Sequence, residues 1–284
     1  MFVIIGTIVV FGSIALGYAL HGGEFGILFQ YTEFIIIGGA AAGTLLIANP
    51  LSITKSIFAR IIGSLKGSSF NKDSYLELLK LLYELFQLAK REGLIALEPH
   101  IENPEGSAIL SRYPTFQANH HAVEFLCDTL KVLLNGGIPA HDLEELMDLD
   151  LETLHHAETQ APSALTTVGD ALPGLGIVAA VLGVVITMGK IDQPPAVIGH
   201  SVAAALVGTF LGILLSYGLV APLAKNIEHL IASEHSYMNS IKASLLSFAK
   251  GAPAVVAVEY GRRAIDPEHR PSFKETEEAV KQAR

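Results

Sequence analysis

Two long apolar stretches in the second half of this sequence contain isolated proline and hydroxyl residues. In a membrane, the polar groups that these residues expose need a hydrogen-bonding partner outside their own helix. The stretches cover residues 171–189 and 201–223, and neither contains an Asp, Glu, Lys, Arg or His. In hydrocarbon, a proline or a buried hydroxyl costs free energy unless another helix or a water path satisfies the freed polar groups. The pattern therefore predicts the wall of a multi-helix membrane assembly. The residues concerned are Pro173, Thr209, Tyr217 and Pro222.

The composition of the whole chain also indicates a membrane protein. Of its 284 residues, 50% are hydrophobic and 17% are charged, and its mean hydropathy is +0.45. The formal net charge is −9, and no basic block or basic aromatic patch interrupts it. We therefore expect no nucleic-acid partner. Cys127 is the single cysteine, which excludes an internal disulfide and is typical of a reducing compartment.

Four stretches are long and apolar enough to cross a hydrocarbon core as helices of about 20 residues. The first lacks a basic leader and a clear cleavage site, so we expect a retained span and not a signal peptide. In the second, Asn49 and Pro50 interrupt the end of the pattern. The four stretches are residues 1–20, 34–53, 171–189 and 201–223.

The positions of the basic residues predict the orientation of these spans. Of the 19 Lys and Arg, nine lie within residues 55–131, nine lie within residues 225–284, and only Lys190 lies between the third and fourth spans. By the positive-inside rule, the linkers at residues 21–33 and 190–200 face outward. Both termini and the long middle segment of this multi-pass protein are then cytoplasmic.

The middle segment is too polar for the bilayer and too regular for a disordered linker. Its leucines predict a broad helical stripe over residues 75–88, with Asn71 and Asp73 as candidate caps and Gly93 at the end. We expect a second helix over residues 117–135. After Gly136, Gly137 and Pro139, an acidic helix should begin near His141, and no alternation of apolar and polar residues predicts a strand.

The expected fold class is therefore an all-α integral membrane protein, with four transmembrane helices and a cytoplasmic helical domain between helices two and three. Its expected parts are a first transmembrane hairpin at 1–53, the cytoplasmic helical domain at 54–169, a second transmembrane hairpin at 170–224 and a cytoplasmic tail at 225–284.

Several polar clusters could carry other chemistry. Glu152 and His155 form a Glu-x-x-His pair at helical spacing, but a di-iron carboxylate site needs a second such pair, which the sequence lacks. The neighbours His120 and His121 point to different sides of a helix. No Walker loop, catalytic triad motif or zinc motif occurs. We therefore expect no enzyme activity, metal or cofactor, and a di-iron membrane enzyme remains an alternative.

Small residues recur at four-residue spacing in the apolar stretches, where they let helices approach closely. The sequence leaves open whether these faces pack within the chain or between subunits. The sets are Gly39 with Gly43, Gly176 with Ala180, Ala179 with Gly183, and Ala204 with Gly208 and Gly212.

Longer motifs resemble a known family. The stretches GDALPGLGIVAAVLGVV and AALVGTFLGILLSYGLVAPLA and the tail AVEYGRRAIDPEHRPSFKETEEAV are similar to the A subunit of the bacterial flagellar stator, the MotA family. The segment REGLIALEPHIENPEGS resembles the cytoplasmic signature of that family. The four-span layout agrees with it over essentially the whole chain.

This resemblance implies a multi-pass subunit of an ion-driven motor in the bacterial inner membrane. In the family, A subunits form a ring, a pentamer, around a dimer of a one-span B subunit (MotB-like), and the complex converts ion flow through a proton channel into torque on the flagellar rotor. The ion-binding group is an aspartate on the B subunit. The four apolar runs of this chain contain no ionisable residue, so the ionisable group that an ion path normally needs must come from a partner.

The resemblance also implies roles for single residues. Pro173 and Pro222 match two functional prolines near the cytoplasmic ends of spans three and four, although prolines also kink or end helices. Thr209 and Tyr217 match positions that line the ion path, with interhelical bonding as the alternative. Ala180 occupies a position where sodium-driven relatives have a threonine. Because a methyl group cannot replace part of the hydration shell of a cation, Ala180 favours proton coupling.

On the cytoplasmic side, Glu98 matches a glutamate that contacts the rotor, and Lys90 or Arg91 stands where the family has a basic residue. The implied partner is the rotor protein of the flagellar switch (FliG-like). A solvated helix end is the alternative for the basic pair. An acidic run is a candidate second contact; it consists of Asp142, Glu144, Glu145 and Asp148.

Two further functions compete with this interpretation. The related proton-driven energisers of outer-membrane processes, ExbB and TolQ, have three spans and lack a tail like PEHRPSF. A passive membrane scaffold would explain the small-residue faces, but it would not explain why Pro173, Thr209 and Pro222 occur together.

Overall fold

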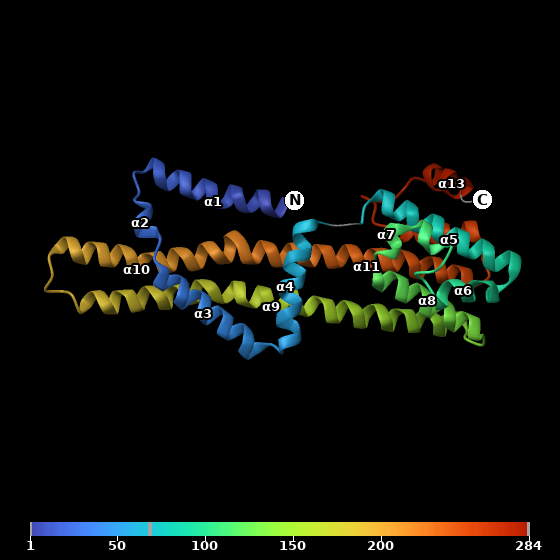
Figure 1. Ribbon diagram of the computed structural model, residues 1–284, viewed down its shortest axis with the longest axis horizontal. Coiled ribbons are helices and arrows are strands. Elements are labelled where there is room, and N and C mark those ends of the chain that lie inside the picture. Colours follow the sequence, from blue (N-terminus) through green and yellow to red (C-terminus); the bar gives the residue numbers. More distant parts are fainter. Residues whose placement is uncertain (1, 68–69, 283–284) are drawn as a thin grey trace. The chain divides into compact units, whose positions relative to one another are not determined.

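The computed structural model describes residues 2–67 and 70–282, and within these ranges the chain forms helices and turns without a strand (Figure 1). Met1, Ser68, Ser69, Ala283 and Arg284 lie outside the described residues. Contacts divide the chain into two compact units. The first unit is Met1–Gly67 with Glu158–Leu230, and the second unit is Ser68–Ala157 with Ile231–Arg284.

The described residues include four helical stretches that are long and apolar enough to cross a membrane, at Phe2–Leu20, Phe25–Ala48, Ala140–Met188 and Pro195–Ala249. The elements that contribute to the first unit are α1 (Phe2–Leu20), α2 (Phe25–Leu28), α3 (Tyr31–Ala48), α4 (Leu51–Lys66), part of α9 (Ala140–Met188), α10 (Pro195–Leu215), a π turn (Ser216–Val220) and the start of α11 (Ala221–Ala249).

The second span ends earlier than the sequence predicted, which was at residue 53. Helix α3 ends at Ala48, and α4 begins at Leu51. The reason is Pro50, whose ring disfavours the helical conformation in the residue before it. Asn49 is accordingly extended, with φ −133° and ψ 144°.

The third and fourth spans are also longer than expected. The acidic helix, which begins at Ala140 as the sequence predicted, continues without a break to Met188, through Pro162 and Pro173. After α10, the helical path continues through the π turn into α11, which ends at Ala249. Neither Pro173 nor Pro222 ends its helix.

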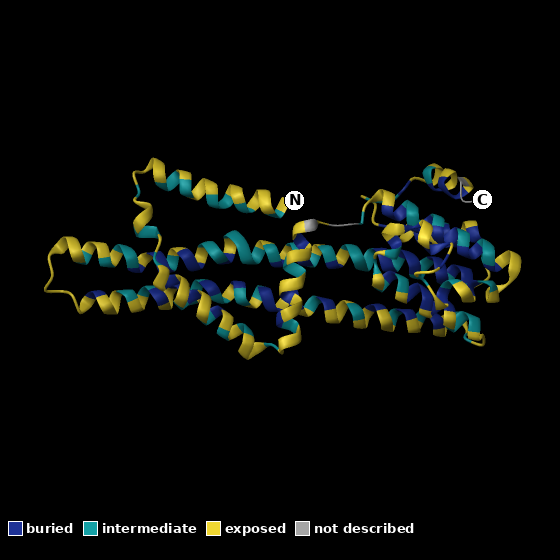
Figure 2. Ribbon diagram, viewed as in Figure 1, coloured by how far each residue is buried: buried dark blue, intermediate teal, exposed yellow. Residues whose placement is uncertain are grey.

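The first unit buries few side chains, and its small core joins α3, α9 and α10. The core consists of Ile37, Ala41, Leu172, Ala179 and Leu211. Helix α1 has no buried residue, and most of its ribbon has the colour of exposed residues in Figure 2. Large apolar side chains that face outward from helices of this composition fit a lipid environment or neighbouring subunits.

The second unit begins with the helix that the leucine stripe predicted, α5 (Lys72–Glu92). The Asn71 side chain accepts a hydrogen bond from the Ser74 amide, and the Ser74 hydroxyl accepts one from the Asn71 amide, so a capping box starts the helix. Gly93 ends it with φ 89°, a conformation that glycine adopts without strain. Both ends follow the sequence prediction.

The other elements of the second unit are short helices packed around α5 and the end of α11. Helix α8 matches the predicted second helix closely, and the start of α9 lies in this unit. The elements are η1 (Leu94–Leu97), α6 (Glu98–Glu102), η2 (Leu110–Arg112), α7 (Pro114–Gln117), α8 (His120–Asn135), α12 (Ala254–Ala264) and α13 (Phe273–Gln282).

The hydrophobic core of the second unit draws on both the middle segment and the C-terminal segment. Phe86 of α5 stacks on Phe248 of α11, with ring centroids 4.3 Å apart. Tyr75 lies against Tyr237 at 5.3 Å, and both tyrosines are 1% exposed. The C-terminal segment is therefore part of a folded core. The four-part division made from the sequence, which follows the expected membrane crossings, stays a prediction.

Candidate functional site

Glycines hold α9 and α10 in close contact inside the first unit, where Figure 1 shows the two helices side by side. A methyl group added at Gly176 would lie 2.7 Å from the carbonyl oxygen of Gly208 and 3.1 Å from Cα of Gly212. About two turns further along, a methyl group at Gly183 would lie 2.6 Å from Cβ of Ala205. These small-residue faces thus pack within the chain.

The small-residue face of α3 behaves differently. A methyl group added at Gly39 or Gly43 would meet no atom of the described chain within 4 Å. Gly39 is exposed and Gly43 is half-buried. This face of α3 has room for another helix.

Pro173 lies inside α9, half-buried, and its ring nitrogen cannot donate a hydrogen bond to the carbonyl of Gly169 four residues earlier. Gly169 packs against the segment that precedes the other functional-proline candidate. A methyl group at Gly169 would lie 3.3 Å from the Val220 side chain and 3.7 Å from the Ala221 nitrogen. The weakened turn of α9 therefore touches the π turn between α10 and α11.

The π turn explains how a continuous helix accommodates Pro222. The Ala221 amide donates to the carbonyl of Ser216, five residues back instead of four. The wider π turn precedes a proline that cannot donate a helical hydrogen bond and whose ring crowds the carbonyl one turn earlier, and such turns are frequent at functional sites. Pro222 itself is exposed. The hydroxyl of Ser216 is buried and has no hydrogen-bond partner among the described residues.

Two other predicted path residues lie beside the contact between α9 and α10. The Ala180 nitrogen lies 3.1 Å from a methyl group built at Gly208, and Cα of Thr209 lies 3.3 Å from one built at Gly176. The structure therefore brings Ala180 and Thr209 to one level of the helix pair. Tyr217 lies in the π turn, two turns further on, and is 68% exposed.

One buried ionisable residue at this contact was missed by the sequence analysis, which placed it in the outward linker. Glu33 lies in the first turn of α3 and is 6% exposed. A methyl group at Gly208 would lie 2.6 Å from its Oε2. The four-residue spacing to Ile37 and Ala41, both core residues, could have revealed it.

In the second unit, the three predicted rotor-contact residues lie on either side of the Gly93 turn, and all are exposed. Lys90 and Arg91 occupy the last turn of α5, and Glu98 is the first residue of α6. The Lys90 Nζ donates to the carbonyl of Gly251 at 3.3 Å. Within residues 2–67 and 70–282, no ion pair involves Arg91 or Glu98. Arg91 is thus the better placed of the two cations for an external contact.

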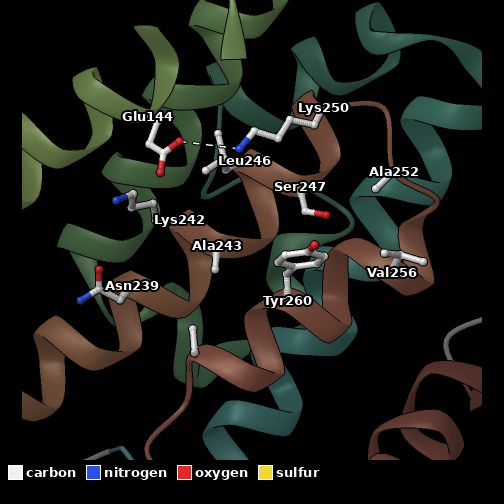
Figure 3. A pocket seen from close by; sticks show the side chains of 11 residues that line it. Glu144, Asn239, Lys242, Ala243, Leu246, Ser247, Lys250, Ala252, Val256 and Tyr260 are labelled. Carbon is white, nitrogen blue, oxygen red and sulfur yellow. Dashed lines mark ion pairs between the residues drawn. The ribbon is translucent and has the colours of Figure 1, made fainter. Parts of the chain in front are cut away.

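The acidic run at the start of α9 is partly neutralised within the chain. In the groove of Figure 3, Glu144 faces Lys250 of α11, with Oε2 and Nζ 3.6 Å apart. Asp148 forms an ion pair with Lys242 of the same helix. Two of the four acidic side chains thus pair with lysines inside this unit.

Two of the histidines considered for metal binding contact side chains of α11 in the second unit. The Nδ1 of His121 lies 3.1 Å from Oε1 of Glu234, and the ring of His155 packs against that of His235 with centroids 4.9 Å apart. Glu152 is exposed.

The tail segment around Glu259 is held together by hydrogen bonds. Glu259 of α12 accepts hydrogen bonds of 2.7 Å from Arg262 and from Arg263. Mainly because of the Arg262 bonds, the pKa of the Glu259 carboxyl falls to about 2. Arg262 also donates to the carbonyl of Pro271, and Arg270 donates to that of Ile265. These bonds tie the loop between α12 and α13 to α12.

Two protein families match parts of this chain. Residues 4–93 match the family described as "Motility protein A N-terminal". Residues 117–240 match the "MotA/TolQ/ExbB proton channel family". The two matches together cover most of α1 and all of α2, α3, α4, α5, α8, α9 and α10.

Whole-chain relatives give the same result. Motility protein A of Salmonella typhimurium is 39% identical over 285 residues, which cover 100% of this chain and 96% of the relative. The structure of MotAB from C. jejuni shares the fold, with a TM-score of 0.79 at 22% identity, covering 95% of this chain and 98% of that one. The flagellar MotAB stator complex from Bacillus subtilis aligns with a TM-score of 0.73 at 25% identity over 90% of this chain and 92% of that one. This chain belongs to the motility protein A (MotA) family.

Proposed function

We propose that this chain is the A subunit of a bacterial flagellar stator. Together with a one-span B subunit of the MotB type, it forms a proton channel and converts ion flow into torque on the rotor. The observation that carries the proposal is the contact between the Pro173 turn of α9 and the π turn before Pro222. Family membership over the full length of the chain supports it.

The mechanism follows from two weakened helical turns in contact. A proline leaves one carbonyl without its helical donor, so the helix bends there at a lower cost than elsewhere. When the transmembrane carboxylate of the B subunit gains or loses a proton beside this contact, the change in charge favours one arrangement of the two turns over the other. Proton passage would thereby move α9, which runs from the first unit into the second.

The ion is a proton in this proposal. Ala180 offers no oxygen to a dehydrated cation, whereas Thr209 offers a hydroxyl to ordered water beside the helix pair. Tyr217, which is exposed in the single chain, is assigned to the same path and would face a neighbouring helix in the assembly.

The partners and location follow from the exposed surfaces. Apolar side chains on α9 face outward within the first unit, among them Ile177, Val181 and Val185. They suit the lipid bilayer or neighbouring helices of a homo-oligomeric ring, which is pentameric in our proposal, in the inner membrane with both termini cytoplasmic. No enzyme activity and no cofactor are part of the proposal.

The second unit would meet the rotor protein of the flagellar switch through Glu98 and through Arg91 or Lys90. Contacts between exposed charges are screened by salt and contribute little individually. That property suits a contact that must form and release at every step of the rotor.

An ExbB-like or TolQ-like energiser is the less favoured alternative. The match of residues 4–93 to the N-terminal family of motility protein A favours the flagellar function, as do the four candidate spans.

Co-expression with a B-type subunit tests the proposal. The chain is purified from membranes with and without a tagged one-span protein that carries a transmembrane aspartate. We expect the two proteins to co-purify as an oligomer. A chain that is inserted and folded but never associates with the B-type protein would contradict the proposal.

A further inference from the structure

Glu33 is an ionisable residue with an unusual environment in the first unit. Its side chain is 6% exposed, and its Oε2 has no hydrogen-bond partner among the described residues. A buried carboxyl group without a partner costs several kcal/mol if neutral and far more if charged. Its presence in a helix that is apolar enough to span a membrane therefore suggests a function.

The carboxyl group points into the helix bundle and not toward lipid. The buried residues of α3 are Glu33, Ile37 and Ala41, which are spaced four residues apart and so lie on one face. Ile37 and Ala41 belong to the core shared with α9 and α10. Glu33 extends that face by one turn and ends against Gly208.

Gly208 provides the space that the carboxyl group occupies. A methyl group at this position would lie 2.6 Å from Oε2 of Glu33, 3.0 Å from Cβ of Ala179 and 3.1 Å from the nitrogen of Ala180. Thr209 is the next residue along α10. The carboxyl group therefore sits at the level of Ala180 and Thr209, the two residues assigned above to the ion path.

Other charged groups on the elements around Glu33 lie far along their helices. The titratable residue of α10 is His200, two turns before Gly208, and Asp170 of α9 lies more than two turns from Ala179. On α4, Lys55 is exposed, and Arg60 forms an ion pair with Glu158 of α9. Among the described residues, no ion pair holds the Glu33 side chain in its charged form.

We infer that Glu33 is a second protonation site of the ion path, carried by this chain and additional to the carboxylate of the B subunit. The inference rests on the proposed function. In each cycle the carboxylate would take one proton from water on the outward side and release it, through water near Thr209, to the next acceptor. The group is returned to its starting state, so no other reactant is needed.

A substitution pair in cells that lack their own stators tests this role. Glu33→Gln keeps the size and polarity of the side chain but cannot exchange a proton, whereas Glu33→Asp can. With the B subunit co-expressed, we expect Glu33→Gln to slow flagellar rotation by about tenfold or more, the scale of losing a proton-transferring group. Glu33→Asp should restore much of the speed. The matched control is Glu24→Gln, an exposed carboxylate nine residues earlier that makes no side-chain cap bond.

The outcomes separate the inference from the proposed function. If the unchanged chain drives rotation and Glu33→Gln does so equally well, the carboxyl group only fills space and the inference is wrong. If the unchanged chain with its B subunit gives no rotation, the result contradicts the proposed function itself, and with it the inference that rests on it.

A chemical test needs no substitution. Dicyclohexylcarbodiimide adds to protonated carboxyl groups in apolar surroundings, and mass spectrometry of the assembled complex locates the adduct. We expect modification of Glu33, decreasing as the pH is raised, and none at Glu24. A complex in which Glu33 stays unmodified at every pH would overturn the inference.

Discussion

Gly176 of α9 and Gly208 of α10 face each other so closely that a methyl group on the first would lie 2.7 Å from the carbonyl oxygen of the second. Backbone atoms on both sides of this contact cannot move aside as a flexible side chain would. The spacing between the two helices is therefore determined at this point, close to Ala180 and Thr209.

Gly176→Ala should therefore separate the helix pair. Overpacking against backbone typically costs about 1–3 kcal/mol, and we expect a lower thermal unfolding midpoint in detergent together with weak motility. Gly174→Ala is the matched control, because a methyl group there meets no described atom within 4 Å. Equal stability of the two variants would show that the helices are not held at this distance.

Pro173→Ala should leave insertion and binding of the B subunit intact while motility falls sharply. The alanine restores a donor for the Gly169 carbonyl and so stiffens the turn that touches Val220. Membrane fractionation, co-purification and swimming speed are measured on the same cells. Loss of membrane insertion would instead assign the proline a purely structural role.

Reversing the charge at Glu98 should weaken torque without changing stability, since Glu98 is exposed at the start of α6. A compensating reversal on the rotor should restore part of the torque. Of the two cations, Arg91→Glu should have the larger effect, because Lys90 already donates to Gly251. The electrostatic contact is excluded if no rotor charge change rescues Glu98→Lys.

The second unit should lose stability in acid through Glu259. Its pKa of about 2 lies below the usual 4.5, so its pairing with Arg262 stabilises the fold above about pH 4.5, and this contribution is lost as the pH falls toward 2. Glu259→Gln should lower the free energy of unfolding by about 1–2 kcal/mol at pH 7 and much less near pH 2.

The control for this prediction is Glu277→Gln, which removes an exposed pair with Lys281 whose side chains are 49% and 60% exposed. Its effect at pH 7 should be below about 0.5 kcal/mol. A Glu259→Gln variant whose thermal midpoint matches that of the unchanged chain at pH 7 would refute the role of the arginine pair.

Local signals in the sequence were reliable guides to this fold. Asn71, Gly93 and the glycines at 136 and 137 mark helix ends by backbone chemistry that depends on few neighbours, and the structure confirms them. The small residues of α9 and α10 likewise predicted close helix packing. Their partners could not be predicted, because Gly176 packs within the chain while Gly39 does not.

The errors came from residues whose role depends on tertiary contacts. Pro173 could have kinked or ended a helix, but α9 continues through it, so that the acidic helix and the third span form one helix. Glu33 looked like a linker residue because it follows a polar stretch. Its spacing to Ile37 and Ala41 was the one local signal of burial, and the space that buries its side chain is left by Gly208 on another helix.

The rotation speed of flagella in stator-deficient cells that express this chain with its B subunit, recorded while sodium and the proton-motive force are varied separately, tests the central claim most directly. A proton-driven stator predicts rotation only when both proteins are present. The speed should be independent of sodium at fixed proton-motive force, and rotation should stop when a protonophore is added. Rotation that follows the sodium concentration and survives the protonophore would contradict the account, as would the absence of rotation when both proteins are assembled in the membrane.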